Sequence, residues 1–102
     1  DLENDEQRAA EIKFYKALKA DSSYSLALFE TAKIRYSKGE MMSARAYVER
    51  YFGSAGKTLD GLELAIKIET ALQTYDLVEQ YQLELTRNFP FSKAAEKIQH
   101  NY

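Results

Sequence analysis

Apolar residues recur every three or four positions along nearly the whole chain, which is the spacing of amphipathic α-helices. Gly and Pro are sparse, and they fall at Gly39, within the 53–56 stretch and at Pro90. No stretch of convincing length alternates apolar and polar residues as a strand would. The pattern therefore predicts an all-α chain of six helices, at about residues 2–20, 25–37, 41–52, 59–73, 75–88 and 93–98.

The expected helix ends follow from local chemistry. Gly39 is expected to turn the chain after the second helix, since glycine readily adopts the left-handed conformation found past a helix C-terminus. Gly53 is expected to end the third helix. Thr58 and Ser92 are expected N-caps, because their hydroxyls can accept a hydrogen bond from the first helical turn. Pro90 disfavours helical geometry in the residue before it, so the fifth helix should stop there.

A fixed period runs through these helices, and its length is that of a tetratricopeptide repeat. Gly39 and Ala44 match the turn glycine and second-helix alanine of such a repeat, which then starts at Ser25. One period further on, a second repeat starts at Leu59, and Pro90 falls on the position where the repeat prefers proline. One period earlier, three residues fall on the second-helix positions that prefer Ala, Phe and Ala: Ala10, Phe14 and Ala17. The chain thus resembles a tetratricopeptide-repeat α-solenoid of antiparallel helix hairpins.

This frame predicts a single domain over residues 1–102. It holds the second helix of a truncated repeat (1–21), a repeat (25–58), a degenerate repeat (59–91) and a C-terminal capping helix (92–102). The second repeat departs from the pattern at Ile66, Gln73 and Val78, so a generic stack of α-hairpins stays open as an alternative. A first helix without its hairpin partner would expose an apolar face, and we expect the chain to be a fragment of a longer array.

Composition narrows the function classes. At 102 residues, 45% apolar and 29% charged, the chain falls in the class of globular domains. A net charge of −2 gives no electrostatic basis for binding nucleic acid or an anionic membrane surface. With no Cys there is no disulfide, thiolate nucleophile or cysteine zinc site. No apolar run reaches the length of a membrane span. The composition favours a protein-binding module.

The sequence contains no complete motif for phosphate binding, metal binding or catalysis. Gly56-Lys57-Thr58 resembles part of a phosphate-binding loop, but Tyr51 stands where the first glycine belongs and a helix is expected in place of the required strand. His100 is the only histidine and has no second ligand nearby. No nucleophile, base and orienting group can be assembled. The sequence therefore predicts no enzyme activity, no cofactor, no metal and no small-molecule substrate.

The aromatic residues are the better candidates, since the chain has eight Tyr and five Phe. In a solenoid of this kind the first helix of each repeat lines the concave surface, where ligands usually dock. The predicted groove consists of Leu26, Phe29, Lys33 and Tyr36 from the first repeat and Glu63, Lys67 and Thr70 from the second. Aromatic rings beside a lysine are typical of interface anchors. The alternative is that Phe29 and Tyr36 only fill gaps between hairpins, and the sequence does not decide between them.

A narrower resemblance rests on two stretches, residues 26–52 and 62–92. The second carries Ile66-Lys67-Ile68, then Tyr81-Gln82-Leu83-Glu84-Leu85, then Phe89-Pro90-Phe91-Ser92. These stretches are similar to the last two repeats of the type IV pilus biogenesis/stability protein family (PilF/PilW). The family's usual Gly-Asp turn is replaced by Gln73-Thr74, and its lipid-carrying N-terminal Cys is absent.

The resemblance implies an outer-membrane lipoprotein that faces the periplasm and contains about six such repeats. It implies a pilotin, which helps secretin subunits reach the outer membrane and assemble there. The expected partner is then a secretin subunit, with membrane contact only through an N-terminal lipid anchor outside this sequence. A tetratricopeptide adaptor in another envelope, secretion or regulatory assembly is the alternative, and an enzyme or nucleotide-binding module is the third hypothesis.

Overall fold

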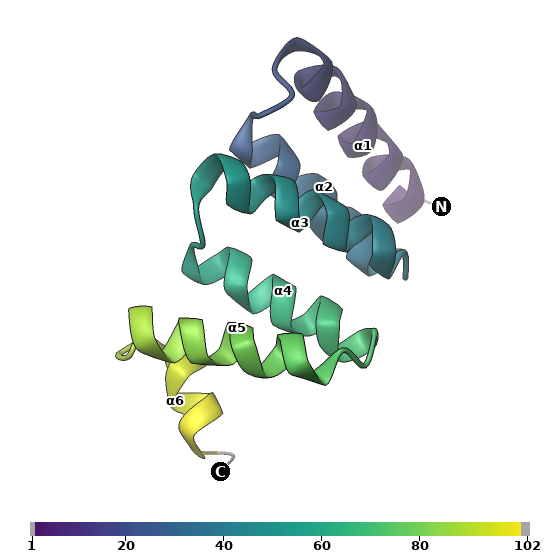
Figure 1. Cartoon of the computed structure of the whole chain (residues 1–102). Helices are drawn as coiled ribbons and strands as arrows, with labels where there is room; N and C mark the ends of the chain where they lie inside the picture. The colour runs from purple at the N-terminus through teal and green to yellow at the C-terminus, as the bar shows by residue number, and fades with distance from the viewer. Residues whose placement is uncertain (1, 101–102) are drawn as a thin grey trace. The chain divides into compact units, whose positions relative to one another are not determined.

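The computed structural model describes residues 2–100, and this range contains six helices and no strand. In chain order they are α1 (Leu2–Ala20), α2 (Ser25–Ser37), α3 (Met41–Ala55), α4 (Leu59–Ala71), α5 (Tyr75–Asn88) and α6 (Lys93–His100) (Figure 1). The all-α prediction is confirmed, and all six expected helices are present, with ends that differ from the expected ones by up to three residues.

The helices form two compact units. The first unit extends to Gly56, and in it α2 packs against both α1 and α3. The second unit begins at Lys57, and in it α5 packs against both α4 and α6. The assignment of residues 1–102 to one domain of tetratricopeptide type, divided into repeats as above, stays a prediction.

The core of the first unit is built from small side chains. Ala32 of α2 and Ala44 of α3 are both fully buried, and such small side chains let two helices approach closely. Larger side chains complete the core on both helices. Its buried apolar residues are Ala27, Leu28, Ala32, Ala44 and Val48.

The second unit has a more aliphatic core. It comprises Leu62, Leu64, Ala65 and Ile68 of α4, Leu85 of α5 and Ala95 of α6. Leu62, Ile68 and Leu85 have no exposed surface at all. Burial of each such side chain stabilises the fold by about 1.5–3 kcal/mol, so these three residues hold α4 and α5 together.

The caps confirm most of the expected helix ends. Thr58 Oγ1 accepts a hydrogen bond from the Gly61 N–H at 3.1 Å, and Ser92 Oγ accepts one from the Ala95 N–H at 3.1 Å.

The expected end of the third helix at Gly53 is wrong, because α3 continues to Ala55. Glycine weakens a helix but keeps its N–H, so it does not interrupt the hydrogen-bond ladder. Gly56 stops the helix instead, with a φ of 82°. Its N–H donates the last bond, to the Phe52 carbonyl.

No helix within the described range is both long and apolar enough to cross a membrane.

Candidate functional site

The four predicted groove residues of the first unit lie at helical spacing on one side of α2. Phe29 is half-buried, and its ring centroid is 5.1 Å from that of Tyr51 on α3. Lys33 Nζ lies 5.1 Å from the Phe29 ring and 3.0 Å from Glu30. Phe29 therefore contacts a ring of α3 and a cation of its own helix, both within the same hairpin.

The other two α2 residues differ in exposure. Leu26 is 52% exposed, which is high for a leucine, while Tyr36 is half-buried. An exposed leucine one turn from an aromatic ring provides an apolar patch that a partner can cover.

The remaining three predicted residues share one side of α4 in the second unit. Glu63 is half-buried, whereas Lys67 and Thr70 are exposed. Thr70 Oγ1 donates to the Ile66 carbonyl at 2.7 Å, so its hydrogen atom is already used within the helix. The structure thus groups the seven residues into two sets, one on each helix, and their union into one groove stays a prediction.

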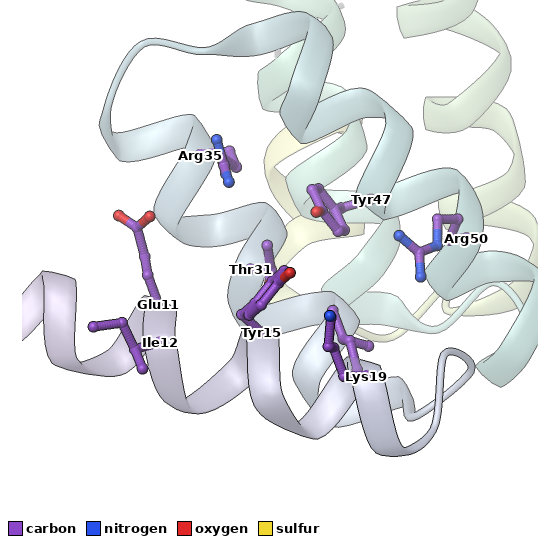
Figure 2. Close-up of a pocket in the computed structure, with 9 residues that line it drawn as sticks. Glu11, Ile12, Tyr15, Lys19, Thr31, Arg35, Tyr47 and Arg50 are labelled. Carbon is purple, nitrogen blue, oxygen red and sulfur yellow. The ribbon is translucent and has the colours of Figure 1, made fainter.

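A pocket of about 400 Å³ in the first unit was not predicted from the sequence. Figure 2 shows the side chains of α1, α2 and α3 that line it. We call it the Tyr47 pocket, and its lining residues are Glu11, Ile12, Tyr15, Leu18, Lys19, Thr31, Arg35, Tyr47 and Arg50.

Cationic side chains lie over two tyrosine rings in this pocket. The Arg50 guanidinium lies 5.2 Å from the Tyr47 ring centroid, and that of Arg35 lies 6.0 Å from it. Lys19 Nζ lies 5.4 Å from the Tyr15 ring. Cation–π contacts of this kind hold these long side chains against the rings.

Ion pairs neutralise part of the pocket's charge. Arg35 Nη1 donates to Glu40 Oε1 at 2.9 Å, and Lys38 Nζ lies 3.1 Å from Glu11 Oε1. The hydrogen bond to Glu40 raises the pKa of Arg35, although partial burial opposes this. The same hydrogen bond lowers the pKa of Glu40, and the nearby charge of Lys38 adds to the effect.

Sequence reasoning missed the Tyr47 pocket because its lining comes from three helices and depends on how they pack. One signal was present. Tyr15 and Lys19 are four residues apart, and Tyr47 and Arg50 are three apart, so each helix places a ring beside a cation.

The weak chemical candidates lie in ordinary structural settings. The loop before Thr58 follows a helix, and Lys57 Nζ is 2.9 Å from Glu84 Oε1 and 5.8 Å from the Tyr81 ring. His100 is exposed and lies 3.7 Å from Glu96. Within the described part of the chain, no group of three or more His, Asp or Glu residues could hold a metal ion.

By sequence, the chain matches no protein-family model and no curated protein. Its fold is similar to two solved structures. PilW, described as a widely conserved type IV pilus biogenesis factor, superposes with a TM-score of 0.85 at 24% identity over 95% of this chain. PilF of Pseudomonas aeruginosa superposes with a TM-score of 0.80 at 24% identity over 99% of this chain.

These likenesses establish the fold. The chain has the all-α, tetratricopeptide-repeat fold of PilW and PilF, and the resemblance seen in the sequence is confirmed at that level. The chain spans 44% of the PilW chain and 46% of the PilF chain.

Proposed function

We propose that this chain is part of a non-enzymatic protein-binding scaffold for type IV pilus biogenesis. In this proposal it acts as a pilotin at the periplasmic face of the outer membrane and promotes assembly of secretin subunits there. A lipid anchor preceding the present sequence would hold it at the membrane.

The observation that carries the proposal is the fold likeness to both PilW and PilF over at least 95% of the chain. Repeat folds of this kind bind protein segments on the surface that successive helices form together. The exposed side chains of α2 fit such a role, because they place an apolar patch at Leu26 on the same side of the helix as the charge of Lys33.

In this proposal the predicted groove contacts the secretin. The aromatic rings of Phe29 and Tyr36 would supply apolar contact area, and Lys33 would pair with a carboxylate of the bound segment. Lys33 already contacts Glu30, so the bound carboxylate would compete with an exposed ion pair that costs little to break.

The test uses cells that carry the intact gene, its clean deletion, or one substitution. Secretin is measured as detergent-resistant multimer and as monomer, after separation of outer and inner membranes. We expect the deletion to leave monomer in the inner membrane, and Tyr36→Ala and Lys33→Glu each to reduce the multimer.

Matched controls lie on the surface outside the predicted groove. Tyr75→Ala removes a tyrosine that is 62% exposed on α5, and Lys93→Glu reverses an exposed charge on α6. Both should leave multimer levels unchanged. Normal multimers in the deletion strain would refute the pilotin role and leave an adaptor in another envelope, secretion or regulatory assembly. Normal multimers in the Tyr36→Ala and Lys33→Glu strains alone would refute only the groove assignment.

A further inference from the structure

The Tyr47 pocket contains none of the seven predicted groove residues, so its chemistry is independent of the proposed secretin contact. We propose that it is a second docking site, which binds a short acidic segment of a partner protein. Carboxylates of the segment would pair with Lys19 and Arg50, and an apolar side chain between them would lie against Tyr15 and Tyr47.

The charge balance of the pocket supports an acidic occupant. Four charged side chains line it, and two of them are already paired: Glu11 with Lys38, and Arg35 with Glu40. Lys19 and Arg50 form no ion pair with any residue that the structure describes. Two positive charges therefore remain uncompensated, and carboxylates complement them.

Hydrogen-bond donors converge on the same end of the pocket. Figure 2 shows Tyr15 and Lys19 reaching up from α1 towards Tyr47 and Arg50 of α3. Arg50 Nη2 donates to the Ser22 carbonyl at 3.0 Å, which fixes the side chain. A guanidinium has five N–H donors, so most of those of Arg50 stay available to a bidentate carboxylate.

The pocket is too large and too apolar for a lone anion. Its volume of about 400 Å³ lies within the range of sites that hold small organic ligands. Ile12 and Tyr15 are 55% and 60% exposed, and Leu18 continues the apolar wall. An apolar side chain of the occupant would cover this surface while its neighbours reach the cations.

A short peptide fits this site better than a long polyanion. The whole chain carries a net charge of −2, so nucleic acid or an anionic membrane would meet overall repulsion. A segment of a few residues meets only the local charges of the pocket. The proposed occupant is therefore a protein segment in which acidic residues flank an apolar one.

The test is an NMR titration of the ¹⁵N-labelled chain with a blocked pentapeptide, Asp-Phe-Glu-Phe-Asp. The matched probe is its neutral analogue, Asn-Phe-Gln-Phe-Asn. We expect saturable shift changes at the amides of Lys19, Tyr47 and Arg50 with the acidic peptide, and at least tenfold weaker binding of the neutral one.

Substitutions locate the site. Arg50→Glu and Lys19→Glu should each weaken binding of the acidic peptide at least tenfold. Arg87 is an exposed arginine of the second unit, and Arg87→Glu should not change the binding. Two variants on different helices keep the test valid if one of them disturbs folding, which the amide spectrum reports directly.

Several outcomes would overturn the proposal. Equal binding of the two peptides would show that charge plays no part, and shift changes confined to Phe29, Lys33 and Tyr36 would place the peptide in the predicted groove. The same shifts with 10 mM inorganic phosphate would indicate a small-anion site. Self-association in sedimentation velocity that Arg50→Glu abolishes would make a second copy of the chain the occupant. None of these results bears on secretin assembly, which the membrane fractionation tests separately.

Discussion

Gly39 and Gln73 occupy the same position in two helix-to-helix turns, and both have a positive φ, 80° and 61°. They lie one repeat period apart in the sequence. The N–H groups of Gly39 and Gln73 donate to carbonyls three residues back, at 3.0 and 3.1 Å. The N–H groups of the next residues, Glu40 and Thr74, donate five residues back, at 2.9 and 3.0 Å. Both turns are therefore Schellman motifs, and only the first has the glycine that suits one.

Replacing Gln73 by glycine should stabilise the second unit. A residue with a Cβ costs roughly 1–2 kcal/mol in the left-handed region, and the greater freedom of glycine in the unfolded chain offsets part of that gain. We expect Gln73→Gly to raise the free energy of unfolding by about 0.5–1 kcal/mol. Urea unfolding followed by circular dichroism measures the change.

Two further variants test whether the conformation of the turn is what makes glycine stabilising at position 73. Gln80→Gly, at an exposed position inside α5, should lower stability by about 0.5–1 kcal/mol, because there glycine only adds backbone freedom. Gly39→Ala should also be destabilising, although the space around a Cβ at Gly39 is open, since the cost arises from the backbone itself. A destabilised Gln73→Gly variant would contradict this account of the turn.

Each of these two turns also contains a hydrogen bond to a glutamate side chain. The side chain of Arg35 contacts Glu40 at 2.9 Å in the first, and Thr74 Oγ1 donates to Glu69 Oε1 at 2.6 Å in the second. Each pair joins the last turn of one helix to the residue before the next helix. The residue types differ completely, but both pairs link the two helices of a hairpin.

The bond between Thr74 and Glu69 is partly buried, and Glu69 itself is only 3% exposed. Thr74→Val keeps the shape and removes the hydroxyl, so the buried side chain of Glu69 loses a hydrogen bond. We expect a loss of about 1–3 kcal/mol of stability, the range for a buried polar group that loses a partner. Thr74→Ser keeps the donor and should recover most of this loss in the same urea experiment. Equal effects of Val and Ser would assign the cost to packing.

The pair of Arg35 and Glu40 should make stability depend on pH. Its hydrogen bond lowers the pKa of Glu40 in the folded chain below the ordinary value of 4.5. A carboxyl group whose pKa is lower in the folded state than in the unfolded state stabilises the fold when the pH is above its unfolded-state pKa. This contribution disappears as the pH falls through the folded-state pKa.

Wild type should therefore have a higher melting temperature than Glu40→Gln at pH 7, and the difference should shrink as the pH falls below about 4.5. Thermal unfolding at pH 7, 5, 4 and 3 measures it. Glu49→Gln, at an exposed position of α3, serves as the control and should show a smaller change with pH. A difference that stays constant from pH 7 to pH 3 would rule out the ionised pair as its source.

The sequence predicted the helices well because each depends on its own apolar periodicity and end signals. The Thr58 and Ser92 caps need only a hydroxyl before a helix, and both were foreseen. The end of α3 was misplaced because Gly53 and Gly56 are equivalent as sequence signals, and only the backbone shows that Gly56 has the positive φ.

Side-chain pairing between helices was much harder to foresee. Lys38 and Glu11 are 27 residues apart, and no spacing rule along one helix connects them. Their pairing decides which charges of the Tyr47 pocket stay uncompensated, so the pocket's chemistry depends on packing. The predicted groove residues, by contrast, follow from helical spacing, and the structure places each set on one helix.

The close approach of α2 and α3 depends on Ala44, which is fully buried. Ala44→Val adds two methyl groups to a packed interface, and such overpacking costs typically about 1–3 kcal/mol. Ala46→Val on the same helix is the matched control, because Ala46 is exposed and should lose only helix propensity, below about 0.7 kcal/mol. Urea unfolding of both variants separates the two contributions. If the losses are equal, the interface tolerates the larger side chain, and a small residue at position 44 is not what brings the hairpin together.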